Sequence, residues 1–182
     1  MTTVQETKVQ PVKSFATPPA LATTTDLAPQ EVRAVTEAVN PLVADAFALY
    51  VKTKNFHWHL YGPHFRDYHL LFDEHADAIL ESVDTMAERV RRIGGTTIRS
   101  ISHISQLQTI RDDNSTMISP DEMVTRLLED NAHMAKMIRD SITVCDKNRD
   151  SATSNQLQEI LDQTERRIWF LFELAQGTKK TS

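Results

Sequence analysis

A single amphipathic stretch, from about Phe65 to Ile93, limits the possible folds of this chain more than any other feature. Its apolar residues recur at three- and four-residue steps, which is the spacing of a helix that faces a core. They are Phe65, Phe72, Ala76, Ile79, Val83, Met86, Val90 and Ile93. The pattern predicts a long central helix that buries one face against other helices.

A second face of this helix carries a histidine and several acids. It comprises His69, Asp73, Asp77, Asp84 and Glu88. At about 100° per residue, these residues lie roughly 100–120° around the helix from the apolar face. Leu70, Leu80 and Ala87 are interleaved with them, so we expect this face to be covered. Buried carboxylates need a partner or a metal ion.

The spacing along this second face predicts where a metal could bind. His69 and Asp73 are four residues apart, as are Asp84 and Glu88, so each pair can hold one ion. The pairs are eleven residues apart, a rise of about 16 Å, whereas metal ligands lie about 2–2.3 Å from their ion. One chain therefore cannot close both pairs around the same ion. An antiparallel copy related by a two-fold axis could, which predicts an intersubunit site that occurs twice per dimer.

The remaining sequence predicts three more long helices. The first runs from about Ala28 to Tyr61. Pro41 lies inside it, so we expect either a kink at Pro41 or a second helix that begins there with Asn40 as its N-cap. Another begins at Ser119 and extends to about Lys147, because Ser-Pro-Asp-Glu is a strong helix start.

The last helix is capped by Asp150 or Ser151 and stops at Gly177. Between Gly95 and the Ser119 helix lies a link of about 24 residues, which is too long for a simple hairpin. Ile101, Ile104 and Leu107 within it predict a short extra helix. The expected fold is an all-α, four-helix bundle with one long crossover that carries this short helix.

Composition limits the function further. A chain of 182 residues predicts one domain, here residues 28–176, between tails at 1–27 and 177–182. It has no uninterrupted apolar run of about 18 residues and no apolar N-terminal signal, so we expect a cytoplasmic protein without a membrane partner. Cys145 is the single cysteine, so any metal is held by oxygen and nitrogen. The net charge of −5 argues against a generally DNA-attracting surface.

Several residues around the two ligand pairs fall in register with a known signature. They are His57-Trp58, Gly62, Phe65, His69, Asp73, Asp84, Glu88-Arg89 and Gly94-Gly95. This pattern resembles the ferroxidase motif of the Dps proteins (DNA-binding proteins from starved cells), which are mini-ferritins of the ferritin superfamily. The resemblance extends from about residue 29 to residue 176.

The resemblance implies a ferritin-like bundle that assembles into a hollow homododecamer with ferroxidase sites at its two-fold interfaces. His57, His69 and Asp73 would come from one subunit, and Asp84 and Glu88 from its two-fold mate. This division agrees with the spacing argument. The site would hold iron and oxidise Fe(II) to Fe(III), with hydrogen peroxide preferred to dioxygen.

The other candidate residues receive smaller roles. Trp58 would pack beside the ligand His57, where it could also donate electrons and shield the site. Asp77 faces the site, but the family does not require an acid there. His75 is expected to pack in the core. His59 and His64 are expected to be surface imidazoles, with the binding of extra metal near the site as the alternative. The sequence gives His103 and His133 no role.

The expected function is iron storage and detoxification that protects DNA from oxidative damage. Iron would enter through acidic three-fold pores, for which Asp150 remains at the start of the last helix, with Glu159 and Asp162 farther in. Flexible basic tails carrying Lys8, Lys13, Lys179 and Lys180 could bind DNA by multivalency, which would place the protein at the nucleoid. The alternatives are a DNA-compacting protein whose metal site only stabilises the dimer, and a non-catalytic zinc or manganese buffer.

Overall fold

The computed structural model describes residues 17–178 of the chain. Within them lie five α-helices and one 3-10 turn, Pro19–Leu21, and no strand. The helices are α1 (Pro29–His59), α2 (Phe65–Arg92), α3 (Ile101–Leu107), α4 (Pro120–Lys147) and α5 (Ser151–Thr178). The predicted fold class is confirmed. The basic tail residues Lys8, Lys13, Lys179 and Lys180 lie outside the described residues.

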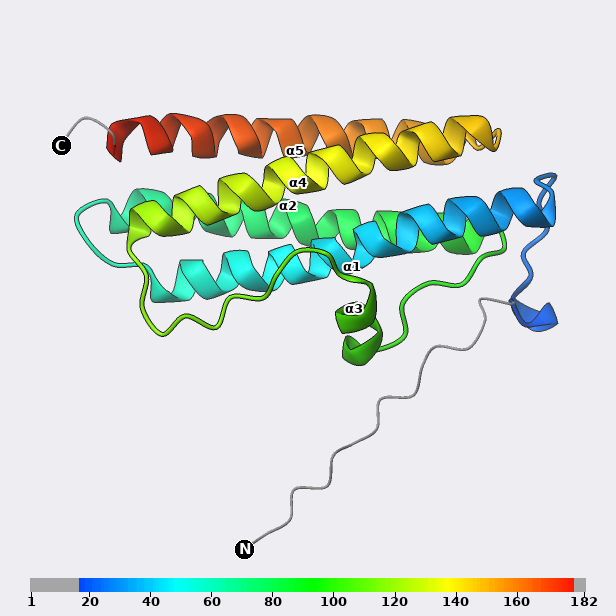
Figure 1. Cartoon of the computed structure of the whole chain (residues 1–182), viewed down its shortest axis with the longest axis horizontal. Helices are drawn as coiled ribbons and strands as arrows, with labels where there is room; N and C mark the ends of the chain where they lie inside the picture. The colour runs from blue at the N-terminus through cyan, green and yellow to red at the C-terminus, as the bar shows by residue number, and fades with distance from the viewer. Residues whose placement is uncertain (1–16, 179–182) are drawn as a thin grey trace, which may run out of the picture.

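The four long helices lie side by side as two antiparallel pairs, α1 with α2 and α4 with α5 (Figure 1). Contacts of α1 with α4 and of α2 with α5 close the bundle. The link between α2 and α4 passes along the outside and carries α3, which packs against α1. Because of this crossover, α2 and α4 run in the same direction, as expected for a ferritin-like bundle.

The apolar face of α2 forms the centre of the core. From Phe72 to Ile93, every residue predicted for that face is buried. Phe65 is the exception, with 44% of its surface exposed. The largest fully buried side chains from the other helices are Leu42, Leu49, Phe56, Met123, Leu127, Met134, Ile138, Leu157 and Leu171. Each such side chain contributes about 1.5–3 kcal/mol, so the bundle is stabilised along its whole length.

Helix α1 is continuous through Pro41, so no new helix starts there. The side chain of Asn40 does not cap a helix. Its amide nitrogen instead donates a hydrogen bond to the backbone oxygen of Thr96, at 2.9 Å. The prediction of a restart is therefore wrong, because the burial of α1 on both sides of Pro41 outweighs the loss of one backbone donor.

Among the described helices, α1 is the one that is long and apolar enough, by length and composition alone, to cross a membrane. The expectation from the sequence that no helix could span a membrane does not anticipate this property, because charged and polar residues interrupt the apolar residues of α1. Within the bundle, 56% of its most apolar window is buried, and α1 contacts α2, α3 and α4. Its apolar character is that of a central helix in a bundle.

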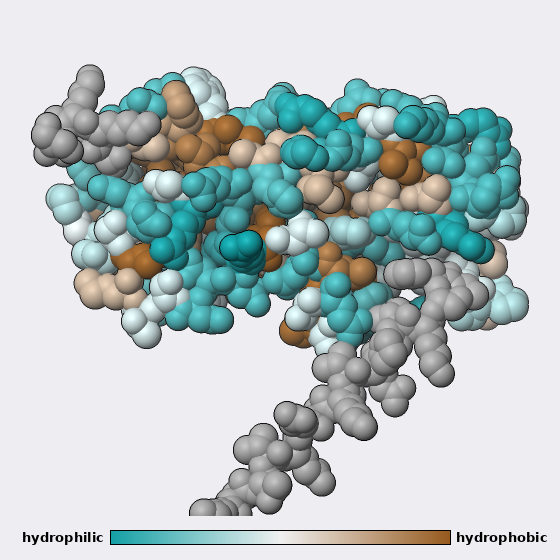
Figure 2. All heavy atoms as spheres, in the orientation of Figure 1, coloured by the Kyte–Doolittle hydropathy of each residue, from teal (hydrophilic) through white to brown (hydrophobic). Residues whose placement is uncertain are grey.

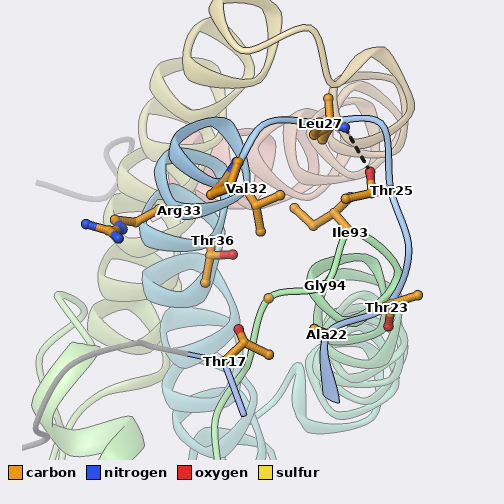
Figure 3. Close-up of a pocket in the computed structure, with 12 residues that line it drawn as sticks. Thr17, Ala22, Thr23, Thr25, Leu27, Val32, Arg33, Thr36, Ile93 and Gly94 are labelled. Atoms are coloured by element: carbon orange, nitrogen blue, oxygen red, sulfur yellow. Dashed lines mark hydrogen bonds between the residues drawn. The ribbon is translucent and has the colours of Figure 1, made fainter. Parts of the chain in front are cut away.

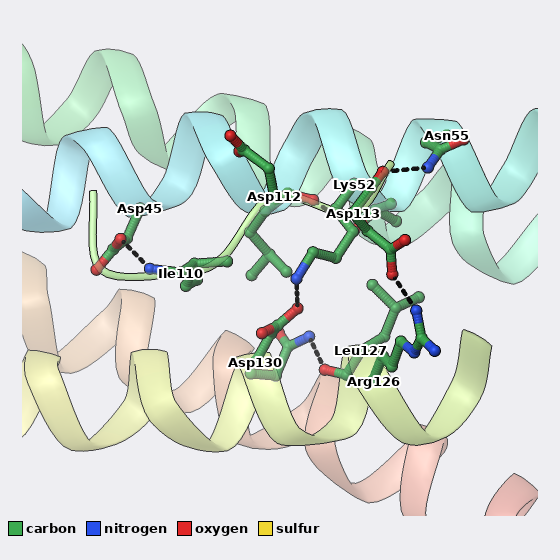
Figure 4. Close-up of polar contacts among 12 residues, drawn as sticks. Asp45, Lys52, Asn55, Ile110, Asp112, Asp113, Arg126, Leu127 and Asp130 are labelled. Carbon is green, nitrogen blue, oxygen red and sulfur yellow. Dashed lines mark hydrogen bonds and ion pairs between the residues drawn. The ribbon is translucent and has the colours of Figure 1, made fainter. Parts of the chain in front are cut away.

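The long crossover is fastened by polar contacts (Figure 4). Asp45, fully buried on α1, accepts hydrogen bonds from the backbone nitrogens of Thr109 (2.5 Å) and Ile110 (2.9 Å). Farther along, Asp113 pairs with Arg126 of α4 at 2.6 Å. A buried carboxylate without hydrogen-bond donors would destabilise the fold, because its lost hydration would not be replaced. The crossover must therefore follow the path that brings these donors to the carboxylates.

The helix ends largely follow the sequence signals. The Ser119 hydroxyl accepts from the backbone nitrogen of Glu122 at the start of α4. Asp150 caps α5 by accepting from the backbone nitrogen of Thr153, at 3.0 Å. Helix α5 continues through Gly177 to Thr178, past the predicted stop. Apolar patches interrupt the hydrophilic surface in the view of Figure 2, one of them in the layer of α4 and α5.

Residues 17–27 lie across the end of α2 and the start of α1, around a pocket of about 270 Å³ (Figure 3). Arg91 donates a hydrogen bond to the backbone oxygen of Leu21, at 2.8 Å. At the turn after α2, Gly94 has φ of +87°, and a Cβ there would lie 2.9 Å from the backbone oxygen of Thr23. Only glycine allows this close approach without strain.

Replacing Gly94 by alanine should therefore destabilise the protein more than replacing Gly62. Both have positive φ, which costs alanine about 1–2 kcal/mol, but a Cβ at Gly62 would meet nothing within 4 Å. Chemical denaturation of Gly94→Ala and Gly62→Ala measures the difference. Equal losses would show that residues 17–27 do not pack on this turn in solution.

The Asp113–Arg126 pair predicts a pH dependence. Burial raises the pKa of Asp113, but the hydrogen bond from Arg126 and those from Ser115 outweigh it, so the pKa falls from 3.8 to about 2. The stability it contributes is present above pH 3.8 and is lost as pH falls towards 2. The advantage of wild type over Asp113→Asn in unfolding free energy should shrink across this range. The neighbouring exposed Asp112, replaced by asparagine, is the control, and an advantage that is unchanged with pH would contradict the assignment.

Candidate metal centre

Two histidines from different helices cross at one end of the α1–α2 pair. The rings of His57 and His69 stack with centroids 3.7 Å apart and planes inclined by 18°. Nδ1 of His57 lies 2.9 Å from the backbone oxygen of His69, and Nδ1 of His69 lies 3.1 Å from the backbone oxygen of His57. A carbonyl oxygen can only accept, so both Nδ1 atoms carry protons. In the neutral rings each Nε2 then has a free lone pair, the arrangement that suits a metal ligand.

Asp73 lies beside these rings, one helical turn beyond His69. Its Oδ1 is 3.8 Å from Nε2 of His57. The same carboxylate accepts a hydrogen bond from the ammonium of Lys54 on α1, which also lies 4.0 Å from Asp77. This hydrogen bond lowers the pKa of Asp73 and raises the pKa of Lys54. Asp73 is thus held as a carboxylate next to the two histidines.

The other predicted pair lies farther along α2 and faces solvent. Asp84 and Glu88 are both exposed in the single chain. Glu88 accepts from Arg92 at 2.6 Å, an exposed pair one turn apart that contributes little stability. Within residues 17–178, no three His, Cys, Asp or Glu side chains are grouped closely enough to hold a metal ion. One chain therefore places Asp73 beside the His57–His69 pair without completing a metal site, and Asp84 and Glu88 lie farther along the same helix.

The acidic face of α2 is not covered within one chain. Leu70 and Leu80, expected to be buried with the acids, are 43% and 40% exposed. Trp58 is 65% exposed and lines a shallow pocket with residues of the crossover, so the prediction that it packs beside His57 is wrong for the single chain. The reason is its position on α1, one residue after His57 and hence about 100° around the helix.

The remaining histidine predictions have different outcomes. His75 is buried, and its ring meets Phe170 of α5 edge to face at 6.4 Å, which confirms its packing role. Burial, with smaller effects of Arg167 and Arg166, lowers the pKa of His75 to about 4, so it is neutral. His133 lies 2.7 Å from the hydroxyl of Thr109, where it adds to the anchoring of the crossover.

Two charged residues were missed by the sequence analysis. Lys54 follows no motif, because its role depends on the distance between two helices. Arg167 is buried on α5, in phase with Leu157, Ile160, Thr164 and Leu171 at three- and four-residue steps. That periodicity was a signal that a basic residue occupies a core-facing position.

Comparisons with known proteins define the family. The chain matches the Ferritin-like domain over residues 36–181. It is 32% identical, over 73% of its length and 89% of the relative's, to a DNA protection during starvation protein of Brevibacillus brevis. It is also 32% identical to a low temperature-induced protein of Nostoc sp., over 83% and 85% of the two chains. The structure of DpsC from Streptomyces coelicolor superposes with a TM-score of 0.83 at 27% identity, over 90% and 95%.

The chain therefore belongs to the ferritin-like proteins, and among them to the Dps mini-ferritins. The helical bundle and its long crossover fit this family.

The geometry predicts unequal roles for two neighbouring lysines. Lys54→Met should lower the free energy of unfolding by less than about 1 kcal/mol, because the Asp73 side chain is 43% exposed and water can solvate it. Lys52→Met should lower the free energy of unfolding by about 2 kcal/mol or more. It removes the ion-pair partner, at 2.6 Å, of the Asp130 carboxylate, which is only 17% exposed. Thermal and urea unfolding of both variants provide the measurement. If the two variants are equally destabilised, the main role of Lys54 is to stabilise the bundle and not to position Asp73.

Proposed function

We propose that this protein is a ferroxidase that oxidises Fe(II) to Fe(III) and stores the product within a hollow dodecamer. The observation that carries the proposal is the reciprocal His57–His69 contact, which leaves both Nε2 lone pairs free, that of His57 lying 3.8 Å from the Asp73 carboxylate. Imidazole nitrogens and carboxylate oxygens without any thiolate are a ligand set suited to iron that must bind and leave again.

A second copy of the chain would complete the site. An antiparallel two-fold mate would place its Asp84 and Glu88 opposite His69 and Asp73, because about 16 Å of helix separates the two pairs in one chain. The exposed Leu70 and Leu80 beside these acids favour such a covering, because a second chain packed on them would remove their apolar surface from water.

In this site the substrate Fe(II) would replace the ammonium of Lys54 as the partner of Asp73. Hydrogen peroxide would accept two electrons, one from each of two Fe(II) ions, to give two Fe(III) and two hydroxide ions. The reaction removes both reagents of hydroxyl-radical chemistry. This is a role in DNA protection, the function named for the Brevibacillus brevis relative.

The path of iron into the shell would be less acidic at one point than the family pattern implies. Asp150, expected at the pore, is only 4% exposed and pairs with Arg89 at 2.9 Å. Its charge is therefore compensated within the chain. Glu159 and Asp162 are exposed and would supply the negative potential that attracts Fe(II).

The DNA-compacting alternative assigns the same metal site a purely structural role. DNA binding would depend on lysines outside the described residues, on a protein whose net charge is −5. Peroxide consumption in proportion to Fe(II) oxidised favours the ferroxidase over this alternative and over a zinc or manganese buffer. A cytoplasmic location, with the nucleoid added if DNA is bound, remains a prediction.

Asp84→Ala and Glu88→Ala should each slow peroxide-driven Fe(II) oxidation by more than about tenfold, since even residues that only support a metal ligand contribute that much. Both side chains are exposed, so folding should be unaffected. Stopped-flow absorbance of Fe(III) formation provides the rate. Glu81→Ala, which removes another exposed acid of the same helix, is the matched control. Normal rates in both ligand variants would exclude the proposed site.

A further inference from the structure

We propose that a pocket between α2 and α5 binds a small oxyanion of the phosphate class through Arg167 and Arg166. The pocket has a volume of about 220 Å³ and is lined by both arginines, Gln163, His75 and Phe170. It opens on the face of the bundle where α2 meets α5, and it shares no residue with the candidate metal centre.

Arg167 is the main reason for this assignment. It is only 5% exposed, and its guanidinium donates to the Asn131 side-chain oxygen at 2.9 Å and to the Thr164 hydroxyl at 2.8 Å. Both acceptors are neutral. Among residues 17–178, no carboxylate oxygen lies within 4.0 Å of its nitrogens. Arginine is rarely buried without a counter-charge, so this side chain is held in place for an anion that the chain does not supply.

The remaining geometry of Arg167 fits an external anion. Its two neutral partners engage Nε and one terminal nitrogen, which leaves the Nη1 donors unused. Burial lowers the pKa of Arg167 to about 10, so it stays charged at neutral pH. The guanidinium is therefore already ordered, and it would lose little conformational entropy when an anion binds. Its planar set of N–H donors matches the paired oxygens of an oxyanion.

Arg166 supplies a second positive charge at the rim. It is exposed, but its guanidinium carbon lies 5.5 Å from the centre of the Phe170 ring, a cation–π contact that orients it over the pocket. It forms no ion pair with any carboxylate of the described chain. An anion in the pocket would therefore meet one buried and one exposed guanidinium.

Two acids, Glu74 and Glu81, also line the pocket and oppose anion binding. Both are exposed, and neither pairs with Arg166 or Arg167. Water and salt screen exposed charges far more than buried ones, so the buried guanidinium dominates the local potential. The acids give the proposal a test of opposite sign, because removing one should strengthen anion binding.

The size of the pocket limits the ligand. Sites for drug-sized molecules occupy roughly 300–1,000 Å³, so a pocket of about 220 Å³ suits a small anion with its waters better than a nucleotide. Guanidinium groups bind phosphate, sulfate and carboxylate through the same paired hydrogen bonds. The common chemistry is therefore an oxyanion, and competition between these anions identifies which one is preferred.

The test is equilibrium dialysis of the assembled, iron-free protein against labelled inorganic phosphate at constant ionic strength. We expect saturable binding that sulfate or acetate displaces and chloride does not. Arg166→Gln should weaken it by about tenfold, since a charge-assisted hydrogen bond is lost, and Glu81→Gln should strengthen it. Arg111→Gln, which removes an exposed arginine of the crossover, is the matched control and should have no effect.

Three outcomes would overturn the proposal: the absence of saturable binding, equal weakening by Arg111→Gln, or displacement by chloride at matched ionic strength. A carboxylate from a neighbouring subunit that filled the pocket would give the first outcome. Arg167→Lys, which keeps the charge but not the fork, separates a loss of recognition from a loss of folding. Asp84→Ala should retain phosphate binding, so this inference can fail or hold independently of the ferroxidase proposal.

Discussion

The rigidity of α2 is the constraint on which the rest of this structure depends. A straight helix holds the Asp73 and Asp84 turns about 16 Å apart, a distance that no side chain can span. The same helix supplies the central apolar face of the core, so it cannot bend to bring its acids together without loss of packing. Under the proposed function, iron oxidation would therefore depend on assembly, because a lone subunit would offer only part of the ligand set.

The contact between His57 and His69 links the fold to the site. Each ring is fixed by the backbone of the opposite helix, so the α1–α2 pairing that buries the core also orients the two imidazoles. Lys54 holds Asp73 nearby through a hydrogen bond, which the proposed metal would have to replace. The crossover is held against α1 through Asp45, on the side of the bundle where α3 packs.

Much of this arrangement could be predicted because it follows helical period and end signals. The long helices, the Ser119 start and the short helix in the crossover all depend on local sequence. The ordered contacts of residues 17–27, the Lys54–Asp73 pair and the exposure of Trp58 could not be predicted, since they depend on which helix faces reach one another. The continuous α1 shows tertiary burial overriding the local preference of Pro41.

Subunit complementation tests the central claim most directly. Asp73→Ala and Glu88→Ala subunits, each inactive alone, should form mixed dimers in which one of the two shared sites retains every ligand. Random mixing by co-expression should then restore about a quarter of the wild-type Fe(II) oxidation rate, because half the dimers are mixed and half their sites are intact. Activity that stays at the level of the separate variants would contradict a site divided between two chains.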